Sequence, residues 1–415
     1  MPTRRGWAVA LTALALAAAG RVLGVFELFV LAAGAVGLLG AGAASVLRRV
    51  DLDANRQLRP ARVHAGGNTR VELVVVNRSG RRSPVLSVRD TVVPSMPPRR
   101  GRSSSGAGRR QARFLLAPLA PGEENRATYR LPAETRGTYS VGPLEAVVSD
   151  SLGLWSRAFV VAPTVELTVY PAVEPVAPLP HSRGDDPTAG APRPAAVGPS
   201  GEDFYGLRPY QLGDDLRRVH WPSTARTGEL VVRQLERPWQ GRATVLLDAR
   251  ATAHSDVTFE VAVSATASIL LASFQSGALV RLATSDGTDS GLAAGHGHFE
   301  AILEHLAVLE PSSSDGLPPV VAGLRRAGNG GGLAVITTTA APATDLELLA
   351  GLHARFDSLT IVLVERRGHS GPSAAGARRG GATLLRVPGD RGFAAAWNHS
   401  MGGGVAAPVT TGGWR

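Results

Sequence analysis

An apolar block that fills the first fifty residues constrains this chain more than any other feature. Residues 7–20 and 22–47 are almost wholly apolar, interrupted by Arg21 and Glu27, and an arginine pair flanks the block on each side. A bilayer core takes about 20 helical residues, so these forty residues are too many for one crossing. The sequence therefore predicts a transmembrane helical hairpin over residues 1–50, with its turn near residues 21–27.

The flanking arginines predict the orientation of the hairpin. Arg4, Arg5, Arg48 and Arg49 lie at the two outer ends of the block, and basic residues favour the cytoplasmic side. We therefore expect a two-pass cell-membrane protein whose soluble domains are cytoplasmic. A signal peptide with residues 7–20 as its apolar region is the alternative, but a second apolar run follows too closely. The first span is short unless its helix continues past Arg21.

Side-chain composition excludes several kinds of chemistry. The chain of 415 residues has no Cys, and all 44 of its basic residues are Arg, against 34 acidic residues. A Walker-A phosphate loop, a Schiff-base lysine and a catalytic cysteine each need a side chain that is missing. The net charge of +10 suits nucleic acid. However, the arginines are spread along the chain without a basic stripe interleaved with aromatics, so we expect no nucleic-acid partner.

The middle of the chain is typical of a β-rich domain followed by a linker. Residues 71–77 alternate in polarity, and short apolar runs separated by Gly and Pro recur at 85–93, 113–116, 126–131, 138–141, 144–148, 159–161 and 165–170. This spacing predicts an antiparallel β-sandwich (Ig-like) domain over residues 51–170, which binds or spaces. Residues 171–200 are rich in proline and predict a linker.

The last third alternates between strand and helix patterns. Strands are expected at 243–248, 279–284, 333–338, 359–365 and 383–387, with helices at 256–274, 298–309 and 344–356. This order predicts an α/β domain with a mostly parallel sheet, within residues 201–400. Ligands of such sheets bind at the carboxyl ends of strands, which selects Asp248 and the loop that follows it. Residues 401–415 are expected to be a disordered tail.

A dense motif over residues 201–236 precedes that domain. It combines aromatic anchors, a Gly-Asp turn and several arginines that can bind carboxylates. Two interpretations stay open: an internal ion-pair clasp and a surface that docks a partner. Catalysis is disfavoured because carboxylates that face arginines have lowered pKa values. The residues concerned are Arg208, Tyr210, Gly213, Asp214, Arg217, Trp221 and Arg226.

This motif closely resembles the signature of the DUF58 family of bacterial membrane proteins, L-R-x-Y-x-x-G-D-x-x-R-x-I/V-x-W-x-x-S/T-A-R. Residues 136–144 and 150–154 are similar to the family's R-G-x-Y-x-x-G-P and D-P-F-G-L elements, although Ser151 and Leu152 depart from the second. The resemblance implies a von Willebrand factor A-like domain. It also implies work with a MoxR-type AAA+ ATPase, in envelope or complex maturation. The molecular activity of the family itself is not established.

A von Willebrand A domain would hold Mg²⁺ through a D-x-S-x-S pattern after its first strand. The corresponding residues here are Asp248, Arg250 and Thr252, and Arg250 places a cation where a hydroxyl ligand is wanted. Residues 333–340 also offer no Asp at the end of their strand. A degenerate metal site at Asp248 and Thr252 is therefore only a weak expectation, and no other cofactor is expected.

These observations lead to one functional expectation and one alternative. We expect a membrane-anchored, non-enzymatic adaptor or scaffold that presents the α/β domain to an AAA+ ATPase or to a client protein. The alternative is a divalent-metal-dependent protein-binding module of the adhesion type. The lipid bilayer is the expected partner of the hairpin.

Overall fold

The structure, a computed structural model, describes residues 1–47, 50–95, 109–180, 204–210, 219–235, 241–313, 316–327, 330–365, 377–379, 381–388 and 392–402. Two compact units divide the chain. The first consists of Met1–Glu174 with Glu300–Glu310, and the second of Pro175–Phe299 with Pro311–Arg415.

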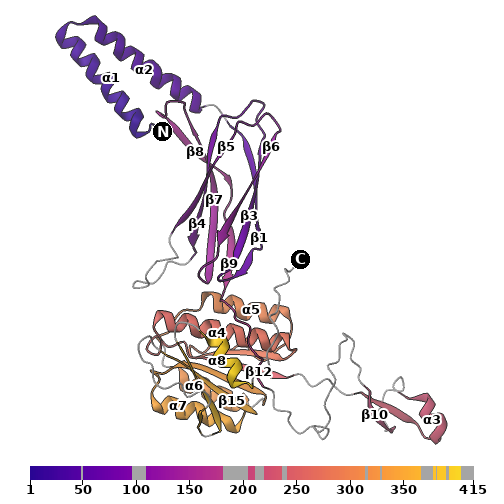
Figure 1. Ribbon diagram of the computed structural model, residues 1–415. Helices are drawn as coiled ribbons and strands as arrows, with labels where there is room; N and C mark the ends of the chain where they lie inside the picture. Colours follow the sequence, from indigo (N-terminus) through magenta and orange to yellow (C-terminus); the bar gives the residue numbers. More distant parts are fainter. Residues whose placement is uncertain are drawn as a thin grey trace. The chain divides into compact units, whose positions relative to one another are not determined.

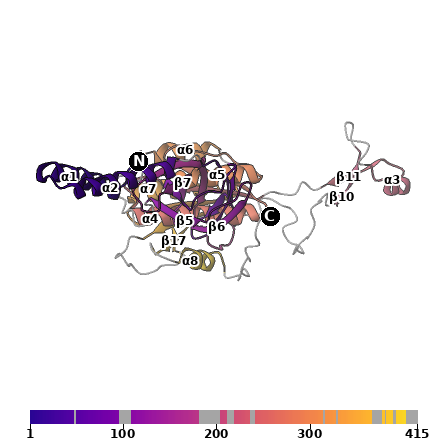
Figure 2. The same cartoon turned by 90° about the horizontal axis from the view of Figure 1, so that it is seen from above.

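The first unit begins with the predicted pair of apolar helices. Helices α1 (Arg4–Leu23) and α2 (Phe26–Leu47) lie side by side in both ribbon views (Figures 1 and 2). Gly24 ends α1 in the left-handed conformation, with φ of 69°, so the turn lies within the predicted range. Each helix is about 30 Å long, the thickness of a bilayer core. The hairpin of two apolar helices is confirmed, and α1 does continue past Arg21.

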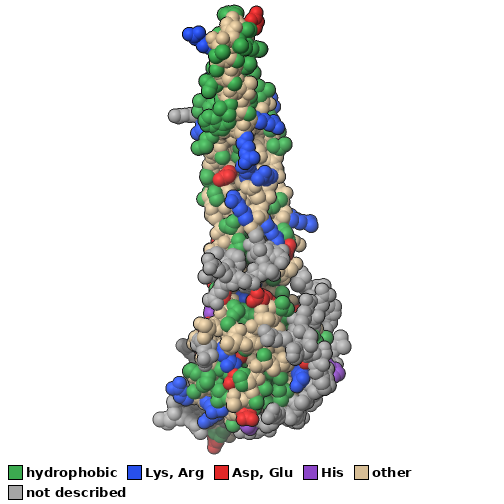
Figure 3. Space-filling view, turned by 90° about the vertical axis from the view of Figure 1, so that its left-hand side faces the viewer, with side chains coloured by type: hydrophobic (Ala, Val, Ile, Leu, Met, Phe, Trp, Pro, Cys, Tyr) green, Lys and Arg blue, Asp and Glu red, His purple; other side chains and the backbone are tan. Residues whose placement is uncertain are grey.

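Hydrophobic side chains cover the outside of this hairpin (Figure 3). Trp7 is 60% exposed, Leu14 69% and Phe26 75%, and few residues of either helix are buried. Apolar surface of this extent is unfavourable in water and favourable in lipid. Both helices are therefore long and apolar enough to span a membrane.

The rest of the first unit consists mainly of two β-sheets around one core. One sheet has the strand order β1-β3-β6, and the other has the order β2-β9-β7-β4-β5 with β8 paired to β7. Alternate side chains of β3, such as Val71, Leu73 and Val75, are buried with Leu86 and Leu144 from the second sheet. The strands are β1 (Leu52–Arg59), β2 (Arg62–His64), β3 (Asn68–Asn77), β4 (Leu86–Pro94), β5 (Arg110–Leu116), β6 (Glu124–Pro132), β7 (Gly137–Ser149), β8 (Ser156–Ala162) and β9 (Val165–Tyr170).

Three strands of this unit differ from the prediction, and the shortest of them, β2, was not predicted. Strand β1 was not predicted, because polar residues such as Asp53 and Asn55 hide its alternation; it forms because all eight residues pair with β3. The predicted strands 138–141 and 144–148 are one strand, β7. The register of β7 against β4 shifts at Gly142-Pro143, and a proline is tolerated at such an irregularity since its missing N–H is not needed there.

The turn between β7 and β8 holds the ends of both membrane helices. The Thr3 N–H donates to the Leu154 carbonyl over 2.8 Å, and the Thr3 hydroxyl also caps α1. Gly6 and Gly42 have no side chain at the points where the helices meet this turn. A Cβ added at Gly6 would lie 2.2 Å from the Leu154 oxygen, and one at Gly42 3.0 Å from the Trp155 ring. The hydrogen bonds of Thr3 and the close approach at these two glycines thus tie the hairpin to the sheets.

A buried ion pair connects the two sheets. Arg56 of β1 contacts Asp90 of β4 at 2.5 Å, and the Tyr129 hydroxyl of β6 donates to the second Asp90 oxygen at 2.7 Å. Burial, followed by the Asp90 charge, raises the pKa of Tyr129, so the phenol keeps its proton and remains a donor. The two buried charges neutralise each other, as buried charges must, while Nε of Arg56 has no hydrogen-bond partner among the described residues.

The second unit contains the predicted parallel sheet, in the order β13-β12-β14-β15-β17-β16, with only the β16–β17 pair antiparallel. Helices cover both faces (Figure 1). The strands are β12 (Arg242–Leu247), β13 (Leu279–Thr284), β14 (Gly332–Thr338), β15 (Ser358–Val364), β16 (Ala377–Arg379) and β17 (Ala382–Val387). The helices are α4 (Asp256–Gln275), α6 (Leu317–Ala327), α7 (Ala343–Ala350), the short 3-10 helix η2 (Gly351–Ala354) and α8 (Phe393–Ser400). Helix α5 (His296–Val308) begins in this unit, and from Glu300 onward its residues belong to the first unit.

Burial distinguishes α4 from the apolar helices α1 and α2. Its composition would also allow it to span a membrane, but 61% of its most apolar window is buried inside this unit, where α4 packs on β12 to β15. On the other face, Leu324 of α6 and Leu349 of α7 pack with Leu333 and Ile361 of the sheet. Helices α6 and α8 were not predicted.

Part of the predicted linker packs into this second unit. Leu179 is buried, and its N–H donates to the Ser273 hydroxyl of α4. The Ala177 N–H donates to Asn398 of α8, and the Trp397 indole donates to the Ala177 carbonyl at 2.8 Å. Residues 175–180 are therefore held by α4 and α8. Residues 181–200 of the linker and 403–415 of the tail lie outside the described residues.

Candidate functional site

The sheet of the second unit has one topological switch point. Strand β12 comes first in the chain, but it lies between β13 and β14, so the connections from β12 and β14 leave in opposite directions. Ligands of open α/β sheets bind in the crevice at the carboxyl ends of such a strand pair. Here those ends lead to Asp248 after β12 and to Thr337 and Thr338 in β14.

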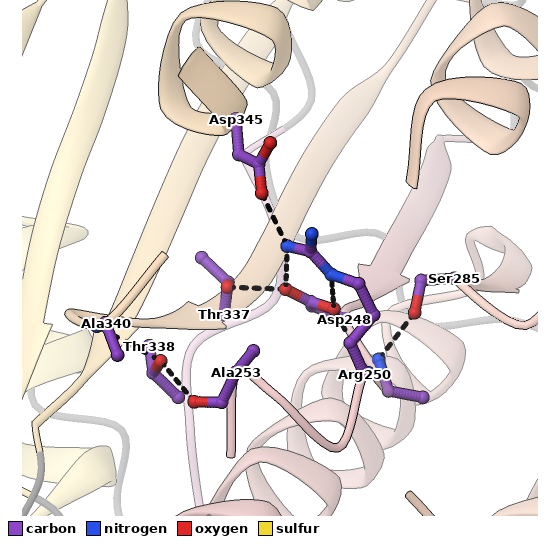
Figure 4. A network of polar contacts seen from close by, with 9 residues as sticks. Asp248, Arg250, Ala253, Ser285, Thr337, Thr338, Ala340 and Asp345 are labelled. Carbon is purple, nitrogen blue, oxygen red and sulfur yellow. Dashed lines mark hydrogen bonds and ion pairs between the residues drawn. The ribbon is translucent and has the colours of Figure 1, made fainter. Parts of the chain in front are cut away.

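Asp248 lies at this point with its carboxylate fully buried. Arg250 binds it with both arms of its guanidinium, Nε to Oδ1 at 2.9 Å and Nη2 to Oδ2 at 2.8 Å. The Thr337 hydroxyl donates to Oδ2 at 2.8 Å (Figure 4). Burial alone would raise the pKa of Asp248, but the hydrogen bonds from Arg250 and Thr337 outweigh it, and the pKa is lowered.

Arg250 also contacts a second carboxylate. Its Nη2 lies 2.8 Å from Oδ2 of Asp345, in the first turn of α7, so the guanidinium lies between two acids (Figure 4). The side chain of Arg250 is 10% exposed, and its hydrogen bond to Asp248 raises its pKa further. Backbone bonds between residues 249–251 and Ser312 fix the loop that carries it. We call Asp248, Arg250, Thr337 and Asp345 the switch-point cluster.

A buried histidine lies on the same loop. His254 is 7% exposed, and its ring meets Phe259 edge-on. Within the part of the chain that the structure describes, neither ring nitrogen has a hydrogen-bond partner. Burial lowers the pKa of His254, and the charge of Asp248 offsets part of that effect. Nearby, the Thr338 hydroxyl donates to the Ala253 carbonyl, and the Ala249 N–H donates to Ser285. The loop is therefore fastened to both β13 and β14.

The donor set of the cluster does not fit a divalent cation. Both Asp248 oxygens already accept hydrogen bonds, and the cation beside them is the guanidinium of Arg250. Thr252 is exposed on the turn that follows Asp248. Among the described residues, no three His, Cys, Asp or Glu side chains are grouped to hold a metal ion. Magnesium binding through Asp248 and Thr252 stays a prediction, and it would have to displace Arg250.

The arrangement is better suited to holding structure than to proton transfer. A carboxylate whose pKa is lowered by an arginine stays ionised near neutral pH and is a weak base. Sequence reasoning selected Asp248 and noted Arg250, but it missed Thr337, Asp345 and His254. The strand pattern at 333–338 could have indicated Thr337. No sequence pattern indicated Asp345, because its contact with Arg250 depends on how α7 packs.

The motif at 201–236 is only partly described. Strands β10 (Phe204–Pro209) and β11 (Val231–Leu235) pair, with Arg208 opposite Val232, and helix α3 (Trp221–Thr227) lies between them in the chain. Tyr210 is half-buried, whereas Trp221 is 64% exposed and Arg226 is exposed. Gly213, Asp214, Arg217 and the side chain of Arg208 lie outside the described part.

Fold and cluster together define a class: a chain with two apolar helices able to span a membrane, a two-sheet region, and a parallel α/β unit with a salt-bridged switch point. Residues 206–378 match the family described as "Protein of unknown function DUF58". This confirms the predicted resemblance over these residues, which include α3 and the switch-point cluster, and the chain carries a DUF58 region.

One curated relative is similar over a stretch of comparable length. The "Uncharacterized protein YeaD" of Bacillus subtilis (strain 168) is 28% identical over 191 residues, which are 45% of this chain and 46% of the relative. The match thus spans about half the length of that relative.

Two solved structures are remotely similar to part of this chain. The CARDB domain of the PF1109 protein from Pyrococcus furiosus, in complex with di-metal ions, is 19% identical; the match covers 29% of this chain and 93% of that one, at a TM-score of 0.20. β-Glucosidase 3B from Thermotoga neapolitana is 13% identical; the match covers 29% of this chain and 17% of that one, at a TM-score of 0.17. Scores this low carry no argument about fold or function.

Proposed function

We propose that this protein is a membrane-anchored, non-enzymatic adaptor. The hairpin holds it in the cell membrane with the soluble domains in the cytoplasm. The two-sheet region is an Ig-like β-sandwich that acts as a spacer. A von Willebrand A-like α/β domain is presented to a MoxR-type AAA+ ATPase or to a client protein, in envelope or complex maturation.

The exposure of Trp221 carries this proposal. A tryptophan that is 64% exposed is unusual in water, and Trp and Arg are enriched among the residues that dominate protein–protein interfaces. Arg226 is exposed on the same short helix, and both lie within the DUF58 region. The salt-bridged Asp248 supports a binding role for the α/β unit, since its lowered pKa makes it a poor general acid.

The test measures association of the full chain, held in lipid nanodiscs, with a MoxR-type ATPase encoded beside it. We expect binding that depends on the bound nucleotide and that Trp221→Ala weakens about thirtyfold, the effect of a typical hot-spot residue. Leu115→Ala is the matched control, because Leu115 is 76% exposed on β5, outside the DUF58 region. Failure to associate in any nucleotide state would contradict the adaptor function, and equal losses in both variants would contradict the role of Trp221.

A further inference from the structure

A row of three arginines crosses the outer face of the three-stranded sheet in the first unit. Arg59 of β1 is directly opposite Arg70 of β3, and Arg70 is directly opposite Arg130 of β6. All three side chains are exposed and, by the alternation along each strand, point to the same face. Residues opposite each other on antiparallel strands are about 5 Å apart, so the row spans about 10 Å.

The row of three arginines destabilises the folded sheet unless an anion binds to it. Like charges directly opposite each other in a sheet repel and destabilise the pairing. Glu72 is the one acid that contacts the row among the described residues, and it lies 3.4 Å from Arg59. In the part of the chain that the structure describes, Arg70 and Arg130 have no ion pair or hydrogen bond to another side chain. Three arginines and one glutamate leave a local charge of +2.

Other basic residues near this sheet are arranged differently. Arg126 of β6 forms an ion pair with Glu124 at 2.9 Å, and Arg78, just after β3, forms one with Asp53 at 3.3 Å. Both pairs lie toward the opposite end of the sheet from the arginine row. The concentration of unneutralised charge in the row is therefore a local feature of this sheet and not a general property of its arginines.

The row also lines a hollow of about 400 Å³, together with Asn68, Thr69 and Glu72. That volume falls within the range of small-molecule sites. Guanidinium groups bind phosphate oxygens in pairs, and a row of them fits several linked phosphates better than a single one. We propose that the arginine row binds a soluble anion that carries two or more phosphate groups.

The position of the row favours a soluble ligand over a lipid headgroup. Strand β1 starts at Leu52, five residues after the end of α2, and Arg59 is the last of its eight residues. At about 3.3 Å per residue, the strand carries Arg59 more than 20 Å along the sheet from its membrane-proximal start. This inference is independent of the proposed adaptor function, because it concerns a different unit and a different ligand.

Calorimetry on the full chain, kept in uncharged detergent at constant ionic strength, tests the proposal with tripolyphosphate as the probe. We expect saturable binding, weakened about tenfold or more by Arg70→Gln and by Arg130→Gln, since each removes charged hydrogen bonds. Arg126→Gln is the matched control and should bind as the unaltered chain does. Without ligand, Arg70→Gln should raise the melting temperature, because it relieves the repulsion; this opposite effect shows that the variant is folded.

Several outcomes would overturn the inference. These are no binding of tripolyphosphate, or equal weakening by Arg126→Gln, which would mean attraction to overall charge. Citrate binding as tightly as tripolyphosphate would mean a carboxylate site. The last measurement uses vesicles that contain phosphatidylglycerol. If the chain binds these vesicles through Arg70 but does not bind tripolyphosphate, the row binds a lipid headgroup instead.

Discussion

Arg250 decides the character of the switch point at the scale of a single residue. Its guanidinium makes two hydrogen bonds to the buried Asp248 and contacts Asp345 on α7. Because a carboxylate buried away from water stays charged only beside an opposite charge, Arg250 keeps Asp248 ionised. Removing one partner of a buried pair costs far more than the pair itself contributes, because a lone buried charge remains.

Arg250→Ala should therefore destabilise the second unit by about 3–5 kcal/mol. The measurement is hydrogen exchange of the β12 and β14 amides, which reports the opening of this unit. Adding Asp248→Asn to the variant should restore part of the loss, since it removes the unpaired charge. Arg326→Ala, at an exposed position of α6, serves as the control. Equal exchange in the Arg250 and Arg326 variants would contradict this account of the cluster.

His254 should make the stability of the same unit depend on pH. Burial lowers the pKa of His254 in the folded chain below its unfolded value of about 6.5, while Asp248 and Arg250 face it with opposite effects. Below a pH of about 6.5, His254 becomes protonated in the unfolded state but stays neutral in the folded state. Stability is thus fully present above that pH and is lost as the pH falls toward the folded pKa, by at most about 1.4 kcal/mol per pH unit.

His254→Phe should flatten this decline, because the ring no longer titrates and Phe suits the contact with Phe259. Urea unfolding at pH 5, 6 and 7 measures the effect. His399→Gln, at an exposed position of α8, is the comparison and should keep the slope of the unaltered chain. A decline that persists unchanged in His254→Phe would assign it to other groups.

At the scale of elements, the connection between the membrane hairpin and the sheets depends on small residues. Gly6 of α1 and Gly42 of α2 allow close approach of the β7–β8 turn, as small residues do at helix interfaces. This turn corresponds to residues 150–154, which the sequence marked as a motif without indicating its role. Its role depends on which elements meet there, and a linear pattern does not contain that information.

Gly6→Ala should loosen this connection, because its Cβ would lie 2.2 Å from the Leu154 oxygen and α1 must shift. We expect a cost of about 1–3 kcal/mol and faster hydrogen exchange of the Thr3 amide, which donates to Leu154. Gly34→Ala in α2 is matched to it, since nothing lies within 4 Å of its added Cβ. Protection of Thr3 that is the same in both variants would show that the turn does not hold α1.

For the molecule as a whole, the orientation in the membrane is the property on which the proposed function depends. Because the chain has no cysteine, a single introduced thiol reports its own compartment. Ser313→Cys lies at an exposed position of the soluble part, and Val25→Cys lies in the turn between the membrane helices. With a maleimide that cannot cross membranes, intact cells should label Val25→Cys and spare Ser313→Cys until lysis. The reverse pattern would place the soluble domains outside.

The amino-acid sequence by itself determined the hairpin of two apolar helices, most strands and the parallel α/β order. Each of these follows from a repeat along the chain: an apolar run of bilayer length, a period of two, or an alternation of strand and helix. It also determined that Asp248 ends β12, because a strand and the residue after it are local facts. Strands β1 and β2 and helices α6 and α8 were not predicted, since their stability comes from the elements that they pair with or pack against.

Only the tertiary structure decided which side chains meet. The Arg56–Asp90–Tyr129 contact, the approach of Asp345 to Arg250 and the alignment of Arg59, Arg70 and Arg130 all join residues far apart in the chain. Strand register and helix packing set these meetings, and a shift of one residue would turn each strand's side chains to the other face. The physical reason is that charges interact through space, whereas the patterns of a sequence run along the chain.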